Sequence, residues 1–192
     1  MSNTVITIGR EYGSGGRLIG KQLAQALGYS FLDKELITLA AQKSGMSAQL
    51  FADIDENATN SLLYSLASGA YMMGSRMAPG SDMPMTDKLF ILQSNIIREE
   101  AEKGPCVVVG RCGDYVMEGR KSVYNIFIQA PFEDRVKRAV AEYGLEEKGA
   151  ADTVRRTDKK RANYYNYYSN RKWGRSSNYH LCVDSSKLGI DG

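Results

Sequence analysis

The sequence predicts an α/β fold in which helices cover both faces of a five-stranded parallel sheet. Three observations lead to this prediction. Short β-branched or apolar runs alternate with segments of helical periodicity along the chain. A glycine-rich loop separates the first run from the first helical segment. The run at residues 106–109 is apolar throughout, as is typical of a parallel strand buried on both faces.

The predicted elements follow one another in a regular order. We expect strands at residues 5–8, 29–32, 106–109, 123–128 and 181–183. We expect helices at residues 18–27, 34–44, 87–101, 131–143 and 151–168. Residues 46–104 show no strand pattern, and we interpret them as a helical insertion with a methionine-rich loop. The 192 residues are thus expected to form one domain with an insertion.

Composition excludes several kinds of chemistry. The three cysteines form no CxxC pair, which argues against a disulfide framework or a cysteine-rich zinc site and favours the reducing cytoplasm. A single histidine, His180, disfavours histidine metal sites and a Ser-His-Asp hydrolase. No apolar run is long enough for a membrane span, and the first residues do not resemble a signal peptide. We therefore expect chemistry based on backbone amides, carboxylates and arginines, with no residue assigned as a metal ligand.

Positive charge is concentrated in one segment. The chain carries a net charge of +3, but residues 155–175 alone carry +7 and the remainder −4. The segment holds eight basic residues and one acid: Arg155, Arg156, Lys159, Lys160, Arg161, Arg171, Lys172, Arg175 and Asp158. Such a basic arm on an acidic body favours a partner with local negative charge, such as phosphate groups.

The glycine-rich loop indicates a phosphate site. Glycines between a strand and a helix let backbone amides turn toward a phosphate, and the helix dipole favours the anion. The alternative is a tight turn that needs glycine only for packing. The candidate residues for binding a nucleotide phosphate are Gly9, Gly13, Ser14, Gly15, Gly16 and Arg17.

The loop departs from the Walker A pattern, G-x-x-x-x-G-K-[ST]. Gly15, Gly20 and Lys21 match its spacing, but this match begins too far past the strand and places the lysine inside the helix. Aligned directly after the first strand, the lysine position holds Gly16, and no Ser or Thr follows to hold magnesium. Arg17 is the expected substitute for the lysine.

Four segments resemble the cytidylate kinase-like family, a branch of the P-loop nucleoside monophosphate (NMP) kinases. They are residues 5–17 (VITIGREYGSGGR), 31–36 (FLDKEL), 108–113 (VVGRCG) and 178–190. In cytidylate kinases the third-strand motif reads D-G-R-D, whereas this chain keeps only the arginine, Arg111. The resemblance implies a three-layer α/β/α P-loop fold, an NMP-binding insertion at 46–104 and an arginine-rich lid at 150–175.

The resemblance also implies an activity and its residues. The expected reaction is phosphoryl transfer from ATP, with Mg²⁺, to a nucleoside monophosphate. Arg111 and Asp33 would face the acceptor, although Asp33 is equally suited to cap a helix. Arg156 and Arg161 would act from the lid, and Asp158 would contact the substrate or orient an arginine.

Two further interpretations stay open. One is a pseudo-kinase that binds a nucleotide without transferring phosphate, because the Walker lysine and hydroxyl are missing. The other, less favoured, is a nucleic-acid-binding module that uses the tyrosines of residues 163–168, Trp173 and the neighbouring basic residues.

Overall fold

A computed structural model of the chain describes residues 3–33, 39 and 84–190. The chain divides into two units, one made of residues 1–33 and 97–192 and the other of residues 34–96. The first unit holds the sheet and the candidate site, and the following description concerns this unit. The predicted helix at 34–44 and the predicted insertion up to residue 83 lie outside the described residues, apart from Leu39, which is helical.

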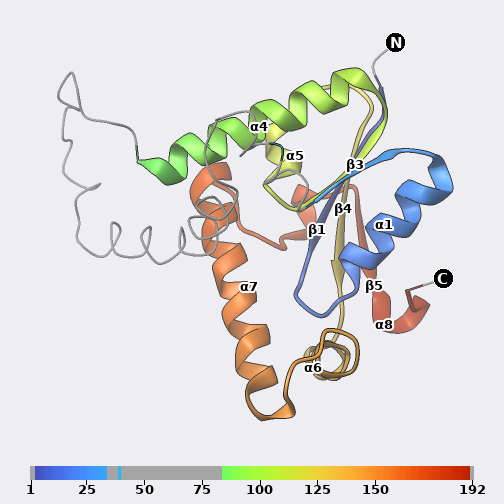
Figure 1. Cartoon of the computed structure of the whole chain (residues 1–192), viewed down its shortest axis with the longest axis vertical. Coiled ribbons are helices and arrows are strands. Elements are labelled where there is room, and N and C mark those ends of the chain that lie inside the picture. Colours follow the sequence, from blue (N-terminus) through green and yellow to red (C-terminus); the bar gives the residue numbers. More distant parts are fainter. Residues whose placement is uncertain (1–2, 34–38, 40–83, 191–192) are drawn as a thin grey trace. The chain divides into compact units, whose positions relative to one another are not determined.

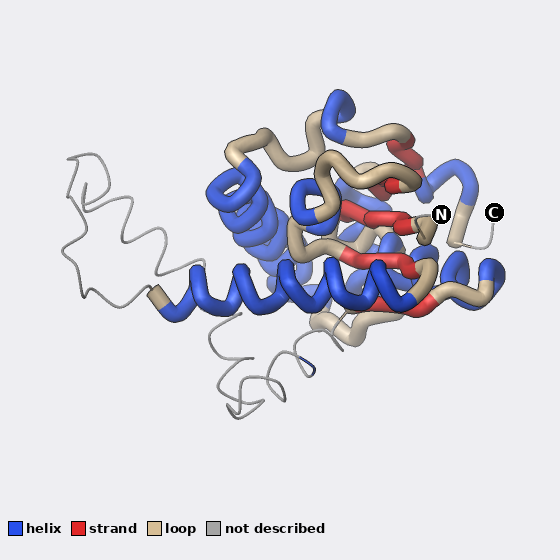
Figure 2. The backbone as a smooth tube through the Cα atoms, turned by 90° about the horizontal axis from the view of Figure 1, so that it is seen from above, coloured by secondary structure: helices blue, strands red, loops and turns tan. Residues whose placement is uncertain are grey.

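The sheet has five strands, all parallel, as predicted (Figures 1 and 2). The strands are β1 (Val5–Arg10), β2 (Ser30–Leu32), β3 (Cys106–Val109), β4 (Val123–Gln129) and β5 (Leu181–Asp184). Their spatial order is β2-β3-β1-β4-β5. The central strand β1 therefore pairs with β3 on one side and with β4 on the other.

The described α-helices are α1 (Gly16–Leu27), α4 (Met85–Lys103), α5 (Gly113–Val116), α6 (Phe132–Ala141), α7 (Glu147–Ser169) and α8 (Ser185–Leu188). Four of them, α1, α4, α6 and α7, lie close to predicted positions, whereas the short helices α5 and α8 are not among the predicted elements. The start of α7 contains a kink, because Lys148 and Gly149 have non-helical dihedral angles. Pro131 precedes α6 as its N-cap residue, where its missing amide hydrogen is not needed. No helix in the described part of the chain is long and apolar enough to cross a membrane.

Alternating side chains of β1 separate two layers of core. Ile6 and Ile8 pack with Val107, Val109 and other apolar residues on the face covered by α1. Gly20 of α1 faces this layer, and a Cβ atom there would come within 2.9 Å of the Ile8 side chain. Helix α5 packs against β1, and Thr7 lies beside its first residue, Gly113. The chain thus folds into the predicted three layers, with helices on both faces of the sheet.

The topology brings two loops to the same edge of the sheet. Ile8 of β1 is in register with Val109 of β3, so both strands end side by side. The glycine loop follows β1, and the turn that carries Arg111 follows β3. Parallel sheets bind ligands at the carboxyl ends of such neighbouring strands.

Candidate functional site

The first strand extends two residues further than the sequence predicts. Gly9 and Arg10 belong to β1, so the loop before α1 consists of residues 11–15. Gly9 is in register with Phe127 of β4, and a Cβ atom on Gly9 would come within 2.8 Å of the Phe127 ring. The structure therefore gives Gly9 a packing role inside the sheet instead of a position in the loop.

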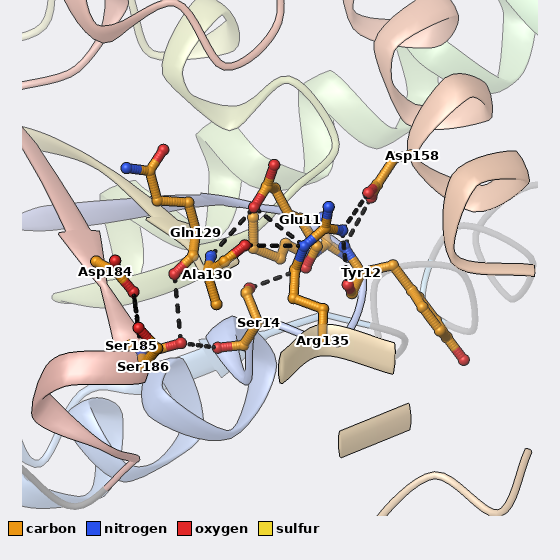
Figure 3. A network of polar contacts seen from close by, with 12 residues as sticks. Glu11, Tyr12, Ser14, Gln129, Ala130, Arg135, Asp158, Asp184, Ser185 and Ser186 are labelled. Carbon is orange, nitrogen blue, oxygen red and sulfur yellow. Dashed lines mark hydrogen bonds and ion pairs between the residues drawn. The ribbon is translucent and has the colours of Figure 1, made fainter. Parts of the chain in front are cut away.

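Side chains from outside the loop hold its carbonyl groups. Arg135 Nη1 donates to the carbonyl of Tyr12 at 3.0 Å, and Arg138 Nη1 donates to that of Gly13 at 2.9 Å. The Ser185 hydroxyl donates to the carbonyl of Ser14 at 2.6 Å (Figure 3). Three successive carbonyls are thus fixed by α6 and by the residue after β5, which sets the backbone conformation of the loop.

Several amides of the loop also have partners within the protein. The Tyr12 amide donates to Asp158 Oδ1 at 2.7 Å, and the Ser14 amide donates to the Glu11 carbonyl at 3.4 Å. The Gly15 amide hydrogen-bonds to the phenol of Tyr143. The buried Ser14 side chain turns back into the loop, since its hydroxyl donates to the Glu11 carbonyl at 2.9 Å. A phosphate on these amides would replace internal hydrogen bonds.

Two glycines of the loop have the left-handed backbone conformation that favours glycine. Gly13 has φ +80° and Gly15 has φ +77°. A Cβ atom on Gly13 would collide with the backbone of Arg135. Gly15 is the N-cap residue of α1, which begins at Gly16 and has no acidic side chain in its first turn. The positive end of the α1 dipole therefore lies at the loop, and no carboxylate in the first turn of α1 offsets it.

Arg135 connects the loop to the predicted lid. Its buried side chain forms an ion pair with Asp158 of α7 and lies 3.3 Å from Glu11 Oε2 (Figure 3). Its Nε also donates to the Ala130 carbonyl at 3.1 Å. Burial raises the pKa of Glu11, against the opposing effects of the Ala130 amide and Arg135. Asp158, predicted to contact the substrate, is thus an anchor between α7 and the glycine loop in this structure.

Three arginines and one carboxylate lie within electrostatic range of Arg10. The charges of Arg161, Arg111 and Arg17 lower the pKa of Arg10, while Asp33 raises it. Arg17 Nε forms an ion pair with the buried Asp33. The predicted residues Arg17, Asp33, Arg111 and Arg161 are thus all close enough to Arg10 to affect its charge.

Arg111 is presented by an unusual turn after β3. Gly110, Arg111 and Cys112 have φ values of +75°, +55° and +53°. Two successive non-glycine residues in the left-handed region cost roughly 1–2 kcal/mol each. Strain of this kind persists where a site needs a side chain in a particular direction. The turn leads into α5 and holds Arg111 close enough to Arg10 for its charge to lower the pKa of Arg10.

The predicted lid arginines separate into two groups. Arg161 Nη1 donates to the Arg10 carbonyl at 3.2 Å, and its guanidinium lies 5.4 Å from the centre of the Tyr12 ring. Burial lowers the pKa of Arg161. Arg156 is exposed, and its Nη2 donates to the Thr153 hydroxyl of its own helix at 3.5 Å. The structure brings Arg161 and Asp158 to the site but not Arg156.

Sequence reasoning missed two arginines. Arg10 is half-buried and Arg135 is buried. Each contacts the glycine loop or residues next to it. Arg10 lies two residues after a β-branched run, at the start of the glycine-rich stretch, and this position is the signal that could have identified it. Arg135 carries no such signal, because one arginine in a charged helix is indistinguishable from the exposed ones without the tertiary structure.

The tyrosine-rich part of α7 is partly buried. Tyr165 donates its phenol hydrogen to the buried Asp114 at 2.6 Å, which ties α7 to α5. Burial is the main cause that raises the pKa of Asp114. Trp173 packs edge-on against Phe127, with ring centroids 5.5 Å apart. Tyr165 is therefore buried and Trp173 is half-buried, and both side chains pack within the unit.

Comparisons with known proteins agree with this geometry. A crystal structure of an uncharacterized protein from Eubacterium ventriosum is 28% identical, with a TM-score of 0.67, and the match covers 98% of this chain and 94% of that one. A shikimate kinase from Bacteroides thetaiotaomicron is 14% identical, with a TM-score of 0.52, over 98% of this chain and 92% of that one. The second similarity shows that this chain shares its α/β fold with a shikimate kinase.

Sequence comparison gives the family. No curated protein matches this sequence. The family described as cytidylate kinase-like matches residues 5–187, which include every strand, the glycine loop, the Arg111 turn and the basic helix. The chain therefore belongs to the cytidylate kinase-like family.

Proposed function

We propose that this protein transfers a phosphoryl group from ATP to a nucleoside monophosphate, as a cytidylate kinase-like enzyme. The observation that carries the proposal is that Arg17, Arg111, Arg161 and Asp33 all lie within electrostatic range of Arg10, the last residue before the glycine loop, and that Arg17 pairs with Asp33. Phosphoryl transfer requires positioning of two phosphates and neutralisation of their charge more than covalent help from the protein. An arginine-rich site at the carboxyl ends of β1 and β3 supplies both.

Each arginine would act from a different element. Arg17, in the first turn of α1, would bind the donor phosphates that rest on the loop and on the α1 dipole. Arg111 would clamp the phosphate of the acceptor, because a guanidinium offers two parallel N–H donors. Arg161, from α7, would stabilise the charge that spreads over the phosphoryl group during transfer. Asp33 forms an ion pair with Arg17, and it would also face the acceptor.

ATP and Mg²⁺ normally act together in such reactions. The described residues include no group of three or more His, Cys, Asp or Glu side chains that could bind a metal. Asp33, Glu11 and Asp158 are each beside an arginine, and the Ser14 hydroxyl is used inside the loop. The donor set here thus provides no dedicated magnesium site, and we assign the ion to no side chain.

The two predicted accessory regions complete this proposal. Residues 46–104 would form the arm that binds the nucleoside monophosphate, and residues 150–175 would form the lid. The contacts of Arg161 and Asp158 with the glycine loop support the second assignment. The three cysteines are free, which is consistent with the reducing cytoplasm as the compartment.

A panel of acceptors tests the proposal. The protein is incubated with ATP, Mg²⁺ and each nucleoside monophosphate, and diphosphate products are measured. We expect CMP or a related pyrimidine nucleotide to give product. We also expect Arg111→Ala to lower kcat/KM at least about 100-fold, as removal of one charge-stabilising group does elsewhere. Arg120→Ala is the control, because Arg120 pairs with Glu102 outside the site. An active Arg111→Ala variant would remove Arg111 from the mechanism.

A nucleotide-binding pseudo-kinase is the second candidate. It is favoured by the internal hydrogen bonds of the Tyr12 and Ser14 amides, which leave the loop satisfied without a phosphate. The same panel separates the candidates, since ATP binding without any product from any acceptor would leave only the pseudo-kinase. A gel-shift at moderate salt tests the less favoured nucleic-acid-binding module.

A further inference from the structure

Arg10 is a charged residue at the end of the central strand. Its side chain lies on the same face of β1 as Ile6 and Ile8, the face that α1 covers. The Arg10 side chain passes beside Gly16, the first residue of α1, since a Cβ atom on Gly16 would come within 2.6 Å of Arg10 Cβ. The guanidinium then lies against Gly110, where any Cβ atom would collide with it. Arg10 thus reaches from beneath the glycine loop to the Arg111 turn.

This path explains why Gly16 has no side chain. When Gly15 is taken as the second glycine of the Walker A pattern, the lysine falls at position 16. Here the space beside that position belongs to Arg10. A lysine at position 16 and an arginine at position 10 would compete for the same volume. The glycine and the arginine are therefore two parts of one arrangement.

Arg10 is held in surroundings that disfavour a cation. Its Nε is buried and has no hydrogen-bond acceptor in the described part of the chain. Burial is the main cause that lowers the pKa of Arg10 to about 9, and the nearby Arg161 is the next. Arg17 and Arg111 also oppose its charge, and Asp33 favours it. Asp33 is already paired with Arg17. Among the described residues, one carboxylate, that of Asp33, favours the Arg10 cation against three arginines that oppose it, and the Arg10 Nε lacks an acceptor.

We propose that Arg10 binds the polyphosphate of a nucleoside triphosphate, supplying from the strand the cation that Walker A loops take from the helix. The inference rests on the proposed function, because it assigns a further binding residue to the same site. A guanidinium reaching this point can donate to two phosphate oxygens at once. Bound phosphate would supply the missing acceptor for Nε and the missing negative charge.

The competing explanation is a structural arginine, and it predicts the opposite effect on stability. If Arg10 served the fold, Arg10→Met would lower the melting temperature of the ligand-free protein. If Arg10 serves a ligand, Met removes a buried, repelled cation and keeps the apolar stem. The ligand-free melting temperature should then stay the same or rise, as it does when residues placed for function are replaced.

The experiment measures binding of sodium tripolyphosphate and of ATP to the full chain by calorimetry, together with ligand-free melting temperatures. We expect Arg10→Met to weaken both affinities about tenfold to 100-fold, the loss typical of charged hydrogen bonds. Arg120→Met is the matched control, because Arg120 is also a partly buried arginine but pairs with Glu102 and the Ala101 carbonyl. It should bind like the parent and melt lower. Arg10→Gln provides a second neutral variant under the same criterion.

The outcomes decide between the explanations. A loss of fivefold or more in either folded Arg10 variant supports the proposal, and a smaller loss in both overturns it. Failure of both variants to fold also overturns it, as does a parent protein that binds no tripolyphosphate. Failure of the proposed function appears differently, as a parent that binds tripolyphosphate but phosphorylates no acceptor. In that case the tripolyphosphate affinities of the Arg10 variants still test whether Arg10 binds polyphosphate.

Discussion

Replacing Arg135 by alanine should destabilise the protein more than any other single change at the glycine loop. The guanidinium donates to the carbonyls of Ala130 and Tyr12 at 3.1 and 3.0 Å. It also pairs with Asp158 and with Glu11, and its side chain is only 9% exposed. One truncation thus removes the common partner of the loop, the end of β4 and the basic helix α7.

The magnitude follows from what the truncation leaves behind. The Asp158 and Glu11 side chains are 15% and 25% exposed. Without the Arg135 guanidinium, these two carboxylates would be left unpaired by Arg135 and poorly hydrated. Breaking a buried ion pair by removing one partner costs about 3–5 kcal/mol, and the partial exposure here favours the lower part of that range. A loss of about 3 kcal/mol should lower Tm by about 6–12 °C in a chain of this size.

The size of the loss should depend on pH. Because burial raises the pKa of Glu11, the folded protein binds more protons than the unfolded one above the ordinary value of 4.5. The free energy of unfolding therefore falls as pH rises through that window. Arg135 opposes this rise of the Glu11 pKa, so its removal raises the pKa further. The destabilisation by Arg135→Ala should be larger at about pH 8 than at about pH 5.

Urea unfolding, followed by tryptophan fluorescence, measures the effect. Trp173 is the only tryptophan and packs against Phe127 of β4, so its emission reports on the unit that holds the sheet. Arg155→Ala is the control, because Arg155 is 64% exposed and pairs with an 86% exposed Asp152. Exposed pairs contribute at most about 1 kcal/mol. An Arg135→Ala variant that loses no more stability than this control would refute the assignment of Arg135 as the connecting residue.

Two further predictions concern α7. Arg161→Ala should lower kcat/KM in the acceptor panel at least about 100-fold, whereas Arg156→Ala should leave it within about threefold, since of the two Arg161 is the one that contacts Arg10. Equal losses in both variants would contradict the orientation of the helix. Tyr165→Phe should cost about 1–3 kcal/mol near neutral pH, because the buried Asp114 loses its donor. Without that donor the pKa of Asp114, already raised by burial, rises further, so urea unfolding should show the cost shrinking as pH falls. A cost that is constant across pH would contradict an ionised Asp114.

The sheet could be predicted from sequence because its signal is local. Each strand is a short apolar run bounded by glycine or polar residues, and parallel pairing follows from the intervening helices. The end of β1 was misplaced for the same reason. Gly9 interrupts the β-branched run and further glycines follow Arg10, so periodicity alone ends the strand at Ile8. Only the pairing of Gly9 with Phe127 and of Arg10 with Ile128 extends it.

The arginines of α7 show what charge density cannot predict. The concentration of basic residues in 155–175 indicated a phosphate-facing segment, but not which residues face the site. Three residues along a helix amount to about −60° around its axis, so Asp158 and Arg161 share a face. Two residues amount to about 200°, so Arg156 points away from Asp158. The face of α7 that lies toward the site is identified by its contacts with Tyr12 of the loop and Arg135 of α6, which both bind Asp158.

The same reasoning explains why a loop without the Walker lysine belongs to a kinase-like fold. A lysine in the first turn of α1 would occupy the volume beside Gly16 that Arg10 takes from the strand. The arginine that the strand supplies is buried near three others of like charge. Such a group is stable only because the surrounding fold, fixed by Arg135 and the core of β1, determines the backbone independently. The positive charge at the loop is therefore best explained by the binding of a negatively charged ligand, as proposed above.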